Sequence, residues 1–223
     1  MGENEARAWI RGRLMPTKHL QHYYLEKIGI DLWLSKTNKA NKKNCLDLLA
    51  KQITTCVNCQ LHRNRKNVVF ARGNPQAKLL LIGEAPGFHE DQQGLPFVGK
   101  AGSLLQKMLY SIGIKDDDVY ITNMIKCRPP ANRDPNNDEI FQCSVYLQQQ
   151  ISLLQPRFIL ALGRFAAQFL ANKPLPLARL RQKLLKYHEI PFTVTFHPAY
   201  LLRQPVDKKK AYMDLLFMRQ FII

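Results

Sequence analysis

No segment of the sequence is long and apolar enough to cross a membrane. A membrane-spanning helix needs about 20 consecutive apolar residues, and no run reaches that length. The N-terminus, MGENEARAWIRGR, lacks the apolar core of a signal peptide. We therefore expect a soluble protein of the cytoplasm, placed in the bacterial cytosol or nucleoid, with no membrane partner.

Acidic residues are scarce. The 17 Asp and Glu residues stand against 33 Lys and Arg residues, which gives a net charge of +16. A positive excess of this size favours a polyanionic partner, and nucleic acid is the commonest one. An anionic membrane surface is the alternative, but no basic amphipathic helix stands out to bind it.

Cysteines are few, and a reducing compartment would keep the five that are present as thiols or metal ligands and not as disulfides. Cys56 and Cys59 have the C-x2-C spacing of a metal knuckle, and Cys127 and Cys143 follow with fifteen residues between them. Four thiolates could hold Zn²⁺ or a [4Fe–4S] cluster, and the spacing does not decide between these groups. Unliganded core cysteines are the alternative. Cys45 is not expected to be a ligand.

The length of 223 residues predicts one well-packed core with an attachment. We place the attachment at residues 1–44 and the domain at residues 45–223. Within the attachment, HLQHYYLEKIGIDLWL has apolar residues near helical spacing, and the polar stretch SKTNKANKKN follows it. Such a segment either docks on a partner or folds back on the domain. Because YYLEKIGIDLW resembles the N-terminal peptide of the psi subunit of bacterial replicative polymerase, residues 15–36 are predicted to contact a replication-complex protein.

Apolar runs without alternation predict strands that are buried on both faces. Four such strands are expected, at 78–82, 119–122, 158–162 and 192–196, and helical patterns lie between them. The expected helices include residues 45–55, 101–112 and 164–172. The alternation of strands and helices predicts an α/β fold with a doubly wound, mainly parallel sheet of four strands.

Polar and aromatic side chains follow these strands where each one ends. Glu84 and the backbone of residues 84–87 follow the first strand, Asn123 follows the second, His197 follows the fourth, and Phe97 lies in a nearby loop. The carboxyl ends of parallel strands meet in one crevice, so these groups are expected together. They suit a planar, hydrogen-bonding heterocycle. Separately, each has an ordinary explanation as a core, capping or pre-proline residue.

Three motifs resemble those of the family 4 uracil-DNA glycosylases. The first comprises GEAPG at 83–87, ED at 90–91 and GLPFVGKAG at 94–102. The second is TNMIKCRPP at 122–130, and the third is HPAYLLR at 197–203. The resemblance implies a three-layer α/β/α fold and an enzyme that hydrolyses the N-glycosidic bond of uracil in single- or double-stranded DNA. The product would be an abasic site for base-excision repair.

The same resemblance assigns the cofactor and the base pocket. It favours a [4Fe–4S] cluster over zinc at Cys56, Cys59, Cys127 and Cys143. Phe97 would stack on uracil, Asn123 would read O4 and N3, and His197 would hydrogen-bond O2 as negative charge accumulates there. The remaining substrate-binding positions would be Glu84, Ala85, Pro86 and Gly87.

The motifs also provide candidate residues for the activation of water and for contacts with DNA. Glu84 or Asp91 would position the attacking water. Leu201 or Leu202 would fill the gap that the flipped base leaves, as wedge residues do, and Arg203 would contact phosphates. The enzyme is expected to act as a monomer.

Two rival interpretations remain. A related class captures uracil-DNA covalently through a histidine in an inserted basic loop, but here Cys127 is followed directly by RPPANR, without an insertion or a histidine. The other rival is a cluster-bearing nucleic-acid adaptor without catalysis. An adaptor would not need Phe97, Asn123 and His197 together.

Overall fold

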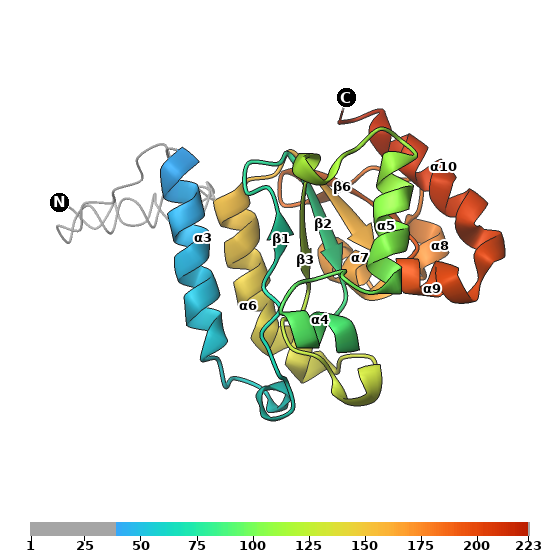
Figure 1. Ribbon diagram of the computed structural model, residues 1–223. Coiled ribbons are helices and arrows are strands. Elements are labelled where there is room, and N and C mark those ends of the chain that lie inside the picture. Colours follow the sequence, from blue (N-terminus) through green and yellow to red (C-terminus); the bar gives the residue numbers. More distant parts are fainter. Residues whose placement is uncertain (1–38, 223) are drawn as a thin grey trace, which may run out of the picture. The chain divides into compact units, whose positions relative to one another are not determined.

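The computed structural model describes residues 39–222 (Figure 1). The predicted docking segment 15–36 lies outside the described residues. Helix α3, Lys39–Thr54, is the first element of the domain and begins six residues before the boundary that we placed at residue 45. Residues 39–44 therefore belong to a helix, although their Lys- and Asn-rich composition suggested a spacer.

The sheet has six strands in the order β1-β3-β2-β4-β6-β5. The four predicted strands are its central, mutually parallel members: β3 (Val119–Asn123), β2 (Leu79–Gly83), β4 (Phe158–Leu162) and β6 (Ile190–Thr195). The expectation of four strands was wrong because two short strands pair antiparallel at the edges, β1 (Arg72–Gly73) and β5 (Leu185–Tyr187). Edge strands of two and three residues carry too little pattern to be recognised in a sequence.

Helices cover both faces of the sheet and complete three layers (Figure 1). The remaining α-helices are α4 (Phe88–Gln93), α5 (Lys100–Tyr110), α6 (Asn137–Leu154), α7 (Arg164–Ala171), α8 (Leu177–Leu180), α9 (Pro198–Arg203) and α10 (Lys208–Arg219). Within residues 39–222, the connections between elements include four short 3-10 helices: Gln60–Arg63, Asp116–Asp118, Pro130–Asn132 and Pro205–Asp207. No helix in residues 39–222 has the length and apolarity that crossing a membrane requires.

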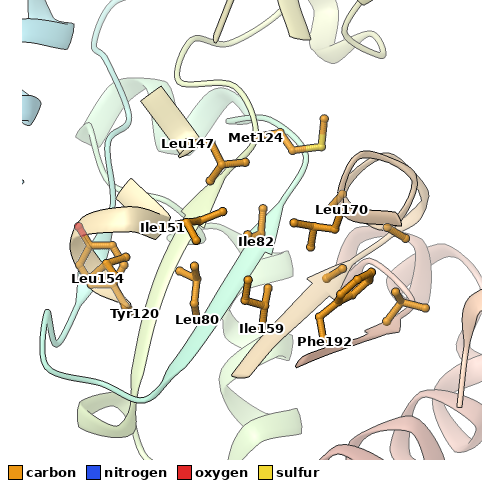
Figure 2. Packing of buried hydrophobic residues seen from close by; sticks show 14 of the residues in the cluster. Leu80, Ile82, Tyr120, Met124, Leu147, Ile151, Leu154, Ile159, Leu170 and Phe192 are labelled. Atoms are coloured by element: carbon orange, nitrogen blue, oxygen red, sulfur yellow. The ribbon is translucent and has the colours of Figure 1, made fainter. Parts of the chain in front are cut away.

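Successive residues of β2 enter two separate cores. Leu80 and Ile82 pack with Ile151 of α6 and Leu170 of α7 on one face of the sheet (Figure 2). Leu79 and Leu81 belong to the core on the opposite face, together with residues of α5 and α10. Because neighbouring side chains in a strand point to opposite faces, a strand with helices on both sides must be apolar at every position.

Candidate active site

A cavity of about 700 Å³ opens where the parallel strands end. Its wall includes most of the residues that the sequence predicted for the base pocket and one predicted for DNA: Glu84, Ala85, Pro86, Gly87, Phe97, His197 and Arg203. Asn123 lies at the end of β3, opposite Gly83 in the parallel register, and is only 2% exposed. Asn123 is not itself part of the wall and lies behind it, against Gly83 and Phe97. Asp91, Leu201 and Leu202 are not part of the wall either.

Gly83 allows the amide of Asn123 and the ring of Phe97 to approach the end of β2. A Cβ atom at Gly83 would lie 2.3 Å from Asn123 Oδ1 and 2.6 Å from Phe97 Cζ, which is too close for any side chain. Asn123 Oδ1 is buried and has no hydrogen-bond partner among the described residues. An unpaired buried acceptor costs about 1–3 kcal/mol, so this atom is set to receive a donor from a ligand.

Phe97 is held in a conformation that few residues adopt. Its φ of 56° lies in the left-handed region, a strained state for an aromatic residue. Glu90 braces the loop by accepting hydrogen bonds at Oε1 from the backbone N–H groups of Val98 and Gly99, each at 3.0 Å. Helix α5 packs directly against the backbone of Phe97 at Gly102, where a Cβ atom would lie 1.7 Å from the Phe97 carbonyl oxygen. The hydrogen bonds from Glu90 and the packing of α5 together fix the backbone that carries the Phe97 ring.

Glu90 is a site residue that sequence reasoning missed. It lines the cavity as well as bracing the Phe97 loop. It stands inside the first motif at 90–91, so its place in that motif was the available signal. The motif alone gave no reason to separate it from Asp91.

His197 is the N-cap residue of α9, and its ring is a neutral hydrogen-bond donor. Nδ1 accepts the backbone N–H of Ala199 at 3.2 Å, so the ring proton sits on Nε2. Burial, with a smaller contribution from the Arg203 charge, lowers the pKa of His197 to about 4. The ring lies beside Phe97, with centroids 5.6 Å apart, so a neutral N–H donor and an aromatic face share one wall of the cavity.

Of the two carboxylates proposed to position water, only Glu84 lines the cavity. Burial raises the pKa of Glu84 to about 7; the Asp134 charge raises it further, and the Arg164 charge opposes the shift. A carboxylate that titrates near neutrality suits general-base work. Asp91 is buried elsewhere and accepts the backbone N–H groups of Lys66 and Asn67 at 2.9 and 3.2 Å, which is a structural role.

The two leucines of the third motif differ completely in exposure. Leu201 is fully buried, whereas Leu202 is 43% exposed. Adjacent helical residues point about 100° apart, so only one of them faces solvent. A residue in the core cannot enter DNA, which leaves Leu202 as the wedge candidate. Arg203, at the end of the same helix, lines the cavity mouth together with Arg133 and Arg164.

The four predicted ligand cysteines surround a second, smaller cavity. Cys56 and Cys59 follow α3, Cys127 follows β3, and Cys143 lies on α6, so three distant segments meet there. Cys45 is not part of this cavity wall. No group of three or more His, Cys, Asp or Glu side chains within residues 39–222 is already arranged as a metal-ion site. Whether the cysteine cavity suits a metal group is therefore judged from the hydrogen-bond donors and the burial around the four thiols.

Those surroundings suit sulfur ligands that carry negative charge. The Arg65 guanidinium donates to Cys127 Sγ at 3.2 Å, and the backbone N–H of Lys126 donates to Cys143 Sγ at 3.3 Å. Burial raises the pKa of Cys143 to about 12 and also raises the pKa of Cys127. Buried thiols of this kind ionise when a cationic centre replaces their protons, and N–H donors to sulfur are typical of iron–sulfur sites.

A buried lysine connects the cysteine cavity with the end of β3. Lys126 is fully buried, and its Nζ donates to the Thr122 hydroxyl and to the Asn123 carbonyl oxygen, both at 2.7 Å, and to the Gln150 side-chain oxygen. All three ammonium protons are thus matched by acceptors. By donating to the Asn123 carbonyl oxygen, Lys126 fixes the backbone from which the Asn123 amide projects. Lys126 is also the residue directly before Cys127.

Comparisons with known proteins show the family to which this chain is similar. A family model described as the uracil DNA glycosylase superfamily matches residues 70–218. A type-4 uracil-DNA glycosylase of Archaeoglobus fulgidus is 42% identical over 72% of this chain and 84% of its own length. The type-4 enzyme of Thermotoga maritima is 40% identical over 73% of this chain and 85% of its own. A type-5 uracil-DNA glycosylase of Thermus thermophilus matches less of each protein, 35% identical over 44% and 51%.

Proposed function

This chain belongs to the type-4 uracil-DNA glycosylases of the uracil-DNA glycosylase superfamily, and we propose that the cavity at the strand ends is where it acts. The protein is a hydrolase that excises uracil from DNA in DNA repair. Breaking the bond between the base and deoxyribose C1′ develops positive charge on the sugar and negative charge on the uracil. A base inside a duplex must first leave the stack, so the enzyme needs a pocket of this kind.

The observation that carries this assignment is the unpaired Oδ1 atom of Asn123. Uracil presents an N3–H donor next to the O4 acceptor. Oδ1 would accept from N3–H, and the Asn123 amide nitrogen would donate to O4, while the Phe97 ring would cover the base. Cytosine has an unprotonated N3 and an amino group at position 4, so the same amide would meet mismatched groups.

His197 supplies the donor for the departing base. Its Nε2–H would bind O2, where charge accumulates in the transition state. A neutral imidazole binds the growing anion more tightly than the ground-state carbonyl, and one such donor is typically worth about 3–4 kcal/mol. Glu84 would orient the attacking water and accept its proton.

The four cysteines would hold a [4Fe–4S] cluster. When bound, the cluster would cross-link the segment after α3, the loop after β3 and helix α6, close to the base pocket. The donors from Arg65 and from the Lys126 backbone support this assignment, because they stabilise charged sulfur. Hydrolysis of the glycosidic bond involves no net electron transfer.

Contact with DNA would come from α9 and the arginines of the cavity mouth. Leu202 would enter the space left by the flipped uracil, and Arg203 would contact a phosphate. The enzyme would work in the cytoplasm as a monomer. Residues 15–36 would bind a replication-complex protein; a pull-down that recovered the same partners after deletion of this segment would reject that role.

The deciding experiment is a gel assay on single- and double-stranded uracil oligonucleotides. The wild type should yield an alkali-labile abasic product. Asn123→Ala and His197→Ala should each lower excision by about 100-fold or more. A stable protein–DNA adduct would instead indicate the covalent-capture class, and binding without product would indicate an adaptor. Metal analysis of the same preparation would distinguish iron from zinc.

A further inference from the structure

An exposed aromatic side chain directly follows a cavity-lining residue in the chain. Phe88 begins α4 directly after Gly87, which lines the cavity. The Phe88 side chain is 50% exposed to solvent. His89 contacts the ring edge-on, with centroids 5.5 Å apart. Phe88 is not part of either of the cores that cover the sheet faces. The short helix α4, which follows the cavity-lining Gly87, therefore determines where the Phe88 ring lies.

An arginine from a distant segment covers this ring. The guanidinium carbon of Arg128 lies 5.1 Å from the centroid of Phe88, within the range of a cation–π interaction. Arg128 Nε donates to Asn132 Oδ1 at 2.7 Å, which orients the guanidinium, and Asn132 itself lines the cavity. The stacked pair is therefore anchored to the wall of the pocket.

No acidic side chain within residues 39–222 neutralises the charge of Arg128 through an ion pair. None of the ion pairs formed by the described residues includes it. A single exposed apolar side chain is ordinary on a protein surface. Here, however, an aromatic face and an uncompensated guanidinium lie together, next to a pocket for a flipped base. That combination is the one that single-stranded nucleic acid binds.

We propose that Phe88 and Arg128 form a stacking site for the nucleobase that neighbours the uracil in single-stranded DNA. The proposal rests on the proposed function and extends it to a second nucleotide. The neighbouring base loses its stacking partner when the uracil enters the cavity, and the Phe88 ring offers a replacement. Arg128 adds a cation beside the backbone phosphate. In a duplex the neighbouring base stays paired and stacked, so the site favours single-stranded substrate.

The test uses a single-stranded oligonucleotide with 2-aminopurine next to a uracil nucleotide. The sugar of that nucleotide carries 2′-fluorine, which blocks excision. Stacking on Phe88 should quench the 2-aminopurine fluorescence in the wild type. Phe88→Ala should restore the fluorescence and weaken binding about 5- to 150-fold, the usual range for one stacked base. Phe88→Trp should retain both properties, and Phe88→Leu, which keeps apolar bulk without an aromatic face, should behave like Phe88→Ala.

Tyr110→Ala is the matched control. Tyr110 is 51% exposed, and it lies at the end of α5 near Asp116, at the opposite end of the sheet from the cavity. This variant should bind like the wild type. Arg128→Gln should lower the slope of log Kd against log salt concentration by about 0.7, as the loss of one phosphate contact on a single strand does. Thermal unfolding of each variant checks that the fold is kept.

The outcomes separate this inference from the function itself. If the wild type excises uracil but Phe88→Ala binds single-stranded DNA as tightly as Tyr110→Ala does, the stacking site is wrong and the glycosylase assignment stands. Equal losses on single- and double-stranded DNA would also reject it. If the wild type excises no uracil, the proposed function fails, whatever the binding data show.

Discussion

Glu84 should give the enzyme an acid limb near neutral pH. Its pKa is raised from 4.5 to about 7, chiefly by burial. If its ionised form orients and deprotonates water, about one tenth of the free enzyme is active at pH 6 and about one hundredth at pH 5. A glutamate with an ordinary pKa would still be mostly ionised at pH 5. The expected fall in kcat/KM between pH 8 and pH 5 is therefore about 100-fold.

The assay is the initial rate of uracil release from a single-stranded oligonucleotide, measured below KM from pH 5 to pH 9. Glu84→Gln should lower the rate and flatten the profile. Asp134→Asn should move the midpoint to lower pH, because the Asp134 charge raises this pKa, and Arg164→Gln should move it to higher pH. His197 stays neutral throughout this range, since its pKa is about 4. An acid limb that persisted in Glu84→Gln would refute the assignment.

The same group should make stability depend on pH. The folded protein binds the Glu84 proton more tightly than the unfolded chain does, because the folded pKa is about 7 against 4.5. The contribution of Glu84 to stability therefore falls as pH rises from 4.5 through 7. Glu84→Gln should raise the unfolding temperature at pH 8 relative to wild type by more than it does at pH 5. An equal change at both pH values would show that the carboxyl ionises freely in the fold.

Three further predictions concern the Phe97 loop, the cysteine site and the two leucines of α9. Gly102→Ala should push the Phe97 loop away, destabilise the fold by about 1–3 kcal/mol in chemical denaturation and raise KM, because the new Cβ would overlap the Phe97 carbonyl. Cys143→Ser should remove iron and visible absorption from the purified protein and lower its unfolding temperature; full iron occupancy would exclude Cys143 as a ligand. Leu202→Ala should slow excision from duplex more than from single strands, whereas Leu201→Ala should cost about 2–5 kcal/mol of stability through the cavity it leaves.

The strands and the pocket residues that end them were readable from local pattern. A run such as LLLIG is apolar at every position because helices cover both faces of the sheet. Parallel pairing then gathers the residues after the strands, so Asn123 comes to lie opposite Gly83. The motifs carried the family, which the comparisons confirm.

Edge strands and helix boundaries were harder to predict from the sequence. Strand β1 has two residues and owes its existence to β3, more than forty residues away. Helix α3 starts within a Lys- and Asn-rich stretch, where composition indicates a spacer. Helix α4 begins with Phe88 directly after the cavity-lining Gly87, but only the fold brings Arg128 over the Phe88 ring.

Local pattern was enough to predict the α/β fold class and the residue types at the strand ends, because burial on two faces and strand-end placement are recorded in neighbouring residues. The motifs were enough to predict the family. The tertiary structure then shows which members of that inventory line the cavity or the surface and which are buried elsewhere. Glu84 faces the cavity while Asp91 binds the backbone of residues 66–67, and Leu202 is exposed while Leu201 fills the core. Such choices depend on what packs against each side chain from distant parts of the chain, and no local pattern records that.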